Sequence, residues 1–171
     1  MGTFSKTLLP SLRIAYLIAP PGLVDAFRGA RAHLDWASPM LEQAVLAEFL
    51  REGHFARHVR RMRSLYQERR EILLEESARH LGWLVEFPQC HTGLHLLGWL
   101  PGHVSDMDLA RKALAAGVDV TPLSVFRSRP GRPGMLLGFA AFDARQIRAG
   151  MERLAPLVAR SMDLGEKAAA S

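Results

Sequence analysis

The residues best suited to chemistry are gathered in the first thirteen positions of the chain. Lys6 is one of three lysines, the others being Lys112 and Lys167, whereas arginine supplies 19 of the 22 basic residues. Arginine stays protonated in proteins and cannot act as an amine nucleophile, but lysine can lose its proton and form a Schiff base. The lysine at position 6 is therefore a candidate nucleophile.

Short hydroxyl side chains and an arginine accompany this lysine. Thr3, Ser5 and Thr7 lie around Lys6, and Arg13 follows seven residues after it. A phosphate-bearing aldehyde cofactor needs an amine to form an imine, hydroxyl groups for the phosphate oxygens, and a guanidinium to neutralise the phosphate. The set meets these needs, but spacing alone favours the simpler interpretation of a surface lysine near a chain end.

The segment that carries Lys6 resembles a known family. "GTFSKTLLPSLRIAYLIAP" is similar to the internal-lysine segment of fold-type I pyridoxal-phosphate enzymes, the class I/II aminotransferases. In particular, it resembles the aminotransferase-like domain of MocR-type transcriptional regulators of the GntR family. The resemblance continues in family order through "HVRRMRSLYQERRE", "TGLHLLGWL", "GVDVTPLS" and "LLGFA", and so covers essentially the whole chain.

The resemblance implies roles for four residues. Lys6 corresponds to the lysine that forms the internal aldimine with pyridoxal 5'-phosphate, and Thr3, Ser5 and Arg13 correspond to phosphate-binding residues. The resemblance also implies a homodimer in the intact protein and an amine or amino-acid effector or substrate. DNA would be contacted only through a domain absent from this chain.

Two departures from the family pattern concern the ligand site. Family members with "RLGFA" use that arginine to bind the α-carboxylate of the substrate, but this chain has Leu136 there, and Arg127, Arg129 and Arg132 are candidates to replace it. The family's acid for the pyridine nitrogen, its stacking aromatic residue and its glycine-rich phosphate turn precede the lysine and are not among these residues. We therefore expect the chain alone to bind the cofactor weakly or not at all.

The predicted fold class is α/β, a partial fold-type I transferase made of the end of the large domain plus the small α+β C-terminal domain. Residues 1–53 are predicted to be a C-terminal remnant of the cofactor-binding large domain, and residues 54–82 a long connecting helix. Residues 83–165 are predicted to form the small domain, and residues 166–171 a tail.

The N-terminal part contains an unusually apolar segment. Residues 12–19 predict a buried strand, and no earlier segment is expected to pair with it. Helices are predicted over residues 21–34 and after Ser38, with Pro39 at the first helical position. We infer that the chain is a piece of a longer protein or the product of a truncated gene, and we expect the apolar faces of residues 12–19 and 37–50 to be partly exposed.

The C-terminal part alternates strands with capped helices. A helix over residues 105–116 is predicted from Ser105 as its cap and Gly117 at its end, and Asp143 is predicted to cap a closing helix. We expect an antiparallel small domain with the 105–116 helix packed on its sheet, and strands over residues 83–87, 92–100, 118–123 and 134–140.

Composition indicates an ordinary globular protein. The net charge of +5 and the pI near 10.1 are too weak to diagnose nucleic-acid binding. The single cysteine, Cys90, suits a reducing compartment, and neither a signal peptide nor an apolar run of membrane-spanning length is visible, so we expect a cytoplasmic protein that does not associate with membranes. His54 and His58 have metal-binding spacing, but "HFARH" lacks a third ligand and favours solvated histidines.

The sequence leaves three functional hypotheses open: a regulator, an enzyme and an inactive fragment. The chain is either the C-terminal part of a MocR-type regulator, which senses pyridoxal phosphate or an amine, or part of an aminotransferase in which Lys6 also moves the α-proton. The arginine-rich segment "HVRRMRSLYQERR" and Leu136 favour the regulator. A fragment without activity of its own is the third reading.

Overall fold

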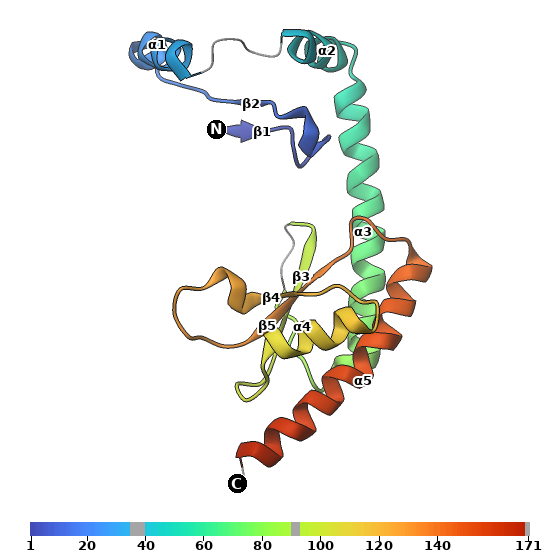
Figure 1. Cartoon of the computed structure of the whole chain (residues 1–171). Coiled ribbons are helices and arrows are strands. Elements are labelled where there is room, and N and C mark those ends of the chain that lie inside the picture. Colours follow the sequence, from blue (N-terminus) through green and yellow to red (C-terminus); the bar gives the residue numbers. More distant parts are fainter. Residues whose placement is uncertain (35–39, 90–92, 170–171) are drawn as a thin grey trace. The chain divides into compact units, whose positions relative to one another are not determined.

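The computed structural model describes residues 1–34, 40–89 and 93–169. The chain divides into two compact units, Met1–Met62 and Arg63–Ser171, which are called unit 1 and unit 2 below (Figure 1). Cys90, Ser38 and Pro39, named in the sequence analysis, lie outside the described residues.

Unit 1 begins with a short hairpin rather than with an unpaired strand. Strand β1 (Gly2–Thr3) pairs antiparallel with β2 (Ala15–Tyr16), so the expectation that nothing precedes the apolar segment to pair with it was wrong. The predicted strand over residues 12–19 is also much shorter than expected. Its first residue ends a 3-10 turn (Pro10–Leu12), and Arg13 then adopts a left-handed conformation, which interrupts extended backbone.

Helices follow the hairpin, as predicted. A 3-10 turn (Pro21–Leu23) leads into α1 (Val24–Leu34), and α2 (Met40–Arg51) follows. Many apolar side chains of this unit are exposed, including Ile18 at 81% and Met40 at 75%. The expected exposure of the apolar faces is therefore confirmed for the described residues.

The longest helix, α3 (His54–Leu81), starts after Gly53, whose φ of 73° is a left-handed value that glycine adopts readily. Its range agrees with the predicted helix. It contributes Leu73 and Leu81 to the core of unit 2, and its last turn is closed by the amides of Leu84 and Val85, which both donate to the carbonyl of Leu81.

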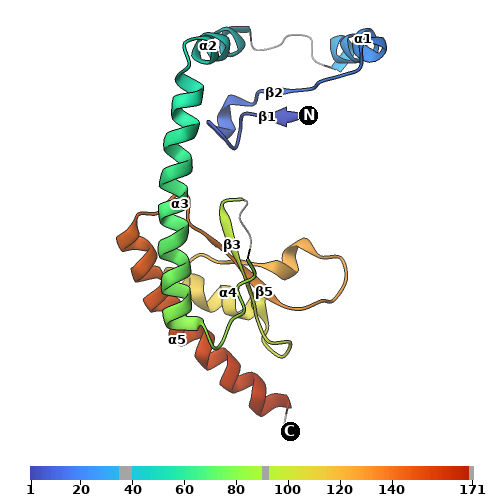
Figure 2. The same ribbon diagram turned by 180° about the vertical axis from the view of Figure 1, so that it is seen from behind.

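Unit 2 contains a three-stranded antiparallel sheet in the order β3-β5-β4. Strands β3 (His95–Trp99), β4 (Thr121–Pro122) and β5 (Gly134–Gly138) are joined by α4 (Asp106–Ala115) and a 3-10 turn (Leu123–Phe126), and the long helix α5 (Ala144–Ala169) follows. The views in Figures 1 and 2 show α4 beside the sheet. The antiparallel strand pairing predicted for residues 83–140 is confirmed for the three described strands.

Two predicted strands are mostly absent. Of residues 83–87, Glu86 makes an isolated bridge to Trp99, because the backbone before it is still bonded to the end of α3. Of residues 118–123, two residues pair, and the second is Pro122, which has no amide hydrogen to continue the ladder. Helix α5 also extends through Ala169, into the range predicted as a tail.

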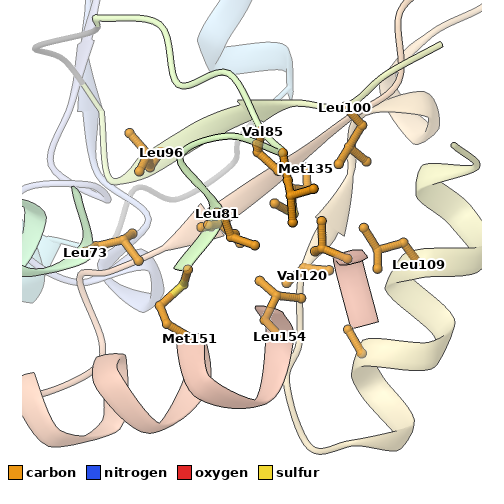
Figure 3. Close-up of a cluster of buried hydrophobic side chains, with 14 of the residues drawn as sticks. Leu73, Leu81, Val85, Leu96, Leu100, Leu109, Val120, Met135, Met151 and Leu154 are labelled. Carbon is orange, nitrogen blue, oxygen red and sulfur yellow. The ribbon is translucent and has the colours of Figure 1, made fainter. Parts of the chain in front are cut away.

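One face of the sheet forms the core of unit 2 with its helices. Leu96 of β3 lies opposite Leu137 of β5, and both are buried, whereas Leu97 and Leu136 on the other face are half-buried. The core brings together α3, α4, α5 and the sheet, and Figure 3 labels ten of its side chains: Leu73, Leu81, Val85, Leu96, Leu100, Leu109, Val120, Met135, Met151 and Leu154.

The predicted caps are present. The Ser105 hydroxyl accepts from the Asp108 amide, and Gly117 after α4 has a φ of 77°. At the start of α5, the Asp143 carboxylate accepts from the Gln146 amide, and the Gln146 side chain accepts in return from the Asp143 amide. This reciprocal pair is a capping box. Among the described residues, no helix is long and apolar enough to cross a membrane.

Candidate functional site

The four residues predicted to hold the cofactor all lie on the β1–β2 hairpin. The Phe4 amide donates to the Ile14 carbonyl at 3.1 Å, which extends the ladder beyond Thr3. Beyond this bond, Ser5 and the left-handed Arg13 are the next residues on the two sides, where the hairpin opens into its loop. Lys6 and Arg13 therefore both belong to the loop end of the hairpin.

Lys6 sits in a tight turn fixed by local hydrogen bonds. The Leu8 amide donates to the Phe4 carbonyl at 2.8 Å, and the Thr7 hydroxyl donates to the same oxygen at 3.3 Å. The Ser5 amide donates to the Thr3 hydroxyl oxygen at 3.2 Å. The lysine side chain is exposed, so its amine is accessible to a ligand.

Arg13 holds an unfavourable backbone conformation. Its φ of 51° and ψ of 28° are left-handed, and among the described residues no other non-glycine residue has a positive φ. Such a conformation costs on the order of 1 kcal/mol for a side chain with a Cβ, and residues of this kind concentrate at functional sites. Its guanidinium is exposed at the open end of the hairpin.

Side chains from the start of α3 support the hairpin. The Phe4 ring lies 5.7 Å from the ring of Tyr16 and 5.7 Å from that of Phe55. His58 Nε2 lies 3.0 Å from the Thr7 carbonyl oxygen, to which it can donate. This contact of His58 could not be predicted from the sequence, since 51 residues separate the partners and no local pattern joins them.

The donor set fits a phosphate-bearing aldehyde. An accessible amine, the hydroxyl of Ser5 and the guanidinium of Arg13 are on one hairpin, and the hydroxyl of Thr3 lies two residues from Ser5. These groups match the requirements for an imine and for phosphate binding. The convergence of the four side chains on one ligand stays a prediction.

The arginines that could replace the missing carboxylate-binding arginine lie in unit 2. Leu136 pairs with Leu97 and Thr121 on the half-buried face of the sheet. The guanidiniums of Arg127 and Arg132 lie 5.5 and 5.4 Å from the centroid of the Trp99 ring.

Both of these arginines have other partners within unit 2. Arg132 also pairs with Glu86 at 2.7 Å, and Arg127 donates to the Arg132 carbonyl oxygen. Arg129 is exposed and lines a cavity of about 500 Å³ beside the start of α4. Arg127 and Arg132 therefore help to hold the loop, and a carboxylate-binding role for Arg129 stays a prediction.

The loop that carries these three arginines, residues 127–133, is called the arginine loop below. A buried carboxylate fixes it at both ends. Asp106 is 4% exposed, and its Oδ2 accepts from the Ser124 amide at 3.1 Å, the Ser124 hydroxyl at 2.9 Å and the Gly134 amide at 3.1 Å. Ser105 was predicted as the helix cap, whereas the role of Asp106 was not predicted. An acidic residue in a first helical turn is common, and its sequence context does not distinguish a buried anchor from an exposed one.

The histidines considered as metal ligands have other surroundings. His54 Nε2 lies 2.9 Å from the Glu52 carboxylate, and both side chains are partly exposed. Among the described residues, no group of three or more His, Cys, Asp or Glu side chains is arranged to hold a metal ion.

The chain is similar to transcriptional regulators and to aminotransferases. No family model matches the chain. The chain is 39% identical over 155 residues to the probable rhizopine catabolism regulatory protein MocR of Rhizobium meliloti, covering 90% of this chain and 31% of that protein. It is 32% identical over 155 residues to the 2-aminoadipate transaminase of Thermus thermophilus, covering 90% of this chain and 39% of that enzyme.

Solved structures show the same relationship. The multiple substrate aminotransferase of Thermococcus profundus matches with a TM-score of 0.86 and 28% identity, over 95% of this chain and 40% of that one. The α-aminoadipate aminotransferase LysN of Thermus thermophilus, complexed with N-(5'-phosphopyridoxyl)-L-leucine, matches with a TM-score of 0.85 and 30% identity, over 95% and 42%. The chain belongs to the fold-type I aminotransferase-like proteins. It corresponds to the C-terminal part of such a domain and spans about a third of the length of the curated relatives it matches.

Proposed function

We propose that this aminotransferase-like chain is the C-terminal segment of the pyridoxal-phosphate-binding domain of a MocR-type transcriptional regulator. The observation that carries the proposal is the 39% identity to a regulator of this kind over 90% of the chain. Two further HTH-type regulators, both from Bacillus subtilis, are 37% and 33% identical. An aminotransferase acting on amino acids is the second candidate, favoured by the transaminase match.

The hairpin residues would divide the work of holding the cofactor. Pyridoxal phosphate supplies an aldehyde for covalent attachment and an electron-withdrawing ring. Lys6 Nζ would provide the amine for attachment, and the Arg13 guanidinium would neutralise the phosphate. The hydroxyls of Ser5 and Thr3 would donate to the phosphate oxygens. In the enzyme alternative, Lys6 Nζ would also carry the α-proton.

The intact protein is proposed to be a cytoplasmic homodimer that responds to an amine or amino acid. DNA binding would belong to a separate domain. Sequencing the DNA upstream of the Met1 codon tests whether the intact protein is a regulator or an enzyme. A winged helix-turn-helix coding sequence in frame supports the regulator, and an aminotransferase large domain without one supports the enzyme.

The role of Lys6 is testable on the purified chain by trapping pyridoxal phosphate with borohydride and locating the label by mass spectrometry. Lys112, which is exposed on α4, serves as an internal reference for unselective reaction. We expect Lys6 to be labelled several-fold faster than Lys112, because Arg13 and the hydroxyls attract the phosphate. We expect Arg13→Gln to remove this preference.

Equal labelling of the two lysines would contradict the assigned role. An absorbance titration complements the trapping experiment, and we expect only weak binding by the chain alone, since a clamp for the ring is not among its residues. A tight, saturable absorbance band in the parent that disappears in Lys6→Ala would show that this chain forms a complete cofactor site by itself.

A further inference from the structure

Unit 2 contains a cavity of about 330 Å³ between β5, α5 and the connection from α4 to β4. Its floor is apolar and buried, formed by Leu73, Val120, Leu137, Ile147, Met151 and Leu154. Figure 3 labels four of these side chains, Leu73, Val120, Met151 and Leu154. Sites for small molecules have volumes of roughly 300–1,000 Å³ and are lined mainly by apolar groups, with a few polar groups that fix orientation. The cavity has the size and the lining of such a site.

Charged side chains of both signs line the same cavity and are exposed. They are Asp119 and Arg153. The guanidinium of Arg153 lies close to Gly117, since a Cβ built there would be 3.4 Å from Arg153 Nη1, and Asp119 follows Gly117 by two residues. Within the described part of the chain, no ion pair links either residue to another side chain. A negative carboxylate and a positive guanidinium that line an apolar cavity complement a molecule that carries both a positive and a negative charge.

A glycine in the middle of α5 leaves part of this space open. Gly150 lines the cavity, and a Cβ built on it would have no atom within 4 Å. Glycine is a poor helix former, and packing against the rest of the chain does not require it here. The space beside Gly150 is therefore open to a ligand in the cavity.

We propose that this cavity binds a free apolar L-α-amino acid such as leucine. Its side chain fills the apolar floor, its carboxylate pairs with Arg153, and its ammonium group pairs with Asp119. The volume suits a single small molecule rather than a peptide. The site shares no residue with the Lys6 hairpin, so the inference does not depend on the proposed cofactor binding.

Calorimetric titration of the purified chain, in the absence of pyridoxal phosphate, tests the proposal. The probes are L-leucine, 4-methylpentanoate, which lacks the amine, and 3-methylbutylamine, which lacks the carboxylate. We expect saturable binding of leucine and at least ten-fold weaker binding of each analogue, because each loses one of the two charge pairs.

Variants locate the binding. Gly150→Leu fills the cavity and Arg153→Gln removes the carboxylate partner, and each is expected to weaken leucine binding at least ten-fold. Gly29→Leu is the matched control, since Gly29 is also a helical glycine, in α1, with no atom within 4 Å of an added Cβ. It is expected to bind leucine as the parent does.

Several results would overturn the proposal. They are the absence of saturable leucine binding by the parent, equal affinity for 4-methylpentanoate, and full affinity in Gly150→Leu. Circular dichroism verifies that each variant is folded. If Arg153→Gln fails to fold, Asp119→Asn tests the same charge complementarity, and unchanged leucine affinity in that variant refutes it.

Discussion

Replacing Asp106 is the most direct test of how unit 2 holds its arginine loop. In Asp106→Ala, the Ser124 amide, the Ser124 hydroxyl and the Gly134 amide all lose their acceptor. Hydrogen bonds to a charged group contribute about 1.5–3 kcal/mol each, and a buried donor left without a partner costs about 1–3 kcal/mol. The Gly134 amide bond is buried, so this donor has little access to replacement water.

The three bonds share one oxygen and are not independent, so their contributions do not simply add. We expect Asp106→Ala to lower the free energy of unfolding by about 3–5 kcal/mol. A urea titration followed by circular dichroism measures this loss. With a typical dependence of ~2 kcal/mol per molar urea, the midpoint should fall by about 1.5–2.5 M.

Asp108→Ala is the matched control for this prediction. Asp108 lies in the same first turn of α4, but its carboxylate is 58% exposed and pairs with the exposed Arg111 at 2.7 Å. Exposed pairs contribute about 0–1 kcal/mol, and both variants lose a similar interaction with the helix dipole. Equal destabilisation by the two variants would refute the assignment of Asp106 as the anchor of the loop.

Two further substitutions test separate features of unit 2. Glu76→Gln should lower the free energy of unfolding by about 1–2 kcal/mol, because it removes the charge of a buried carboxylate. That carboxylate lies 3.3 Å from Arg79, 3.4 Å from His80 and 3.4 Å from Arg148 of α5. These partners are themselves partly exposed to water, which limits the loss. Glu75→Gln, at an exposed site paired with Arg79, is the control, and an equal loss there would contradict the prediction. Gly117→Ala should cost about 1–2 kcal/mol, because its φ of 77° is unfavourable for alanine and Arg153 lies close by. Gly102→Ala, where an added Cβ meets nothing within 4 Å, should change the stability by less than about 0.5 kcal/mol in the same urea assay.

The sequence predicted best where local signals determine the structure. The ends of α4 follow from the hydroxyl of Ser105 and the left-handed Gly117, and the start of α5 follows from Asp143, because each cap acts within a few residues of itself. Strands were predicted less well. Residues 83–87 have the composition of a strand, but pairing depends on a partner elsewhere in the chain, and their backbone is partly bonded to the end of α3 instead.

The candidate site shows the same division. Lys6 and Arg13 could be named from residue chemistry and from the family resemblance, because both are close in sequence. The histidine that contacts the Lys6 turn and the carboxylate that fixes the arginine loop could not be named, since their partners lie 51 and up to 28 residues away. The left-handed backbone of Arg13 was also invisible in the sequence, because arginine rarely adopts it.

The two units differ in how they are stabilised, and this difference decides what each assay reports. Of the 19 buried hydrophobic residues among the described side chains, Leu46 alone belongs to unit 1, and the other 18 belong to unit 2. Burial of apolar surface is the dominant favourable contribution to folding, so cooperative unfolding of the chain is governed by unit 2. The urea midpoint therefore reports the effects of replacing Asp106, Glu76 and Gly117, because all three residues lie in that unit. The Lys6 hairpin rests on a few ring contacts and hydrogen bonds, so a change there alters cofactor trapping without moving the midpoint, and the two experiments separate loss of the site from loss of the fold.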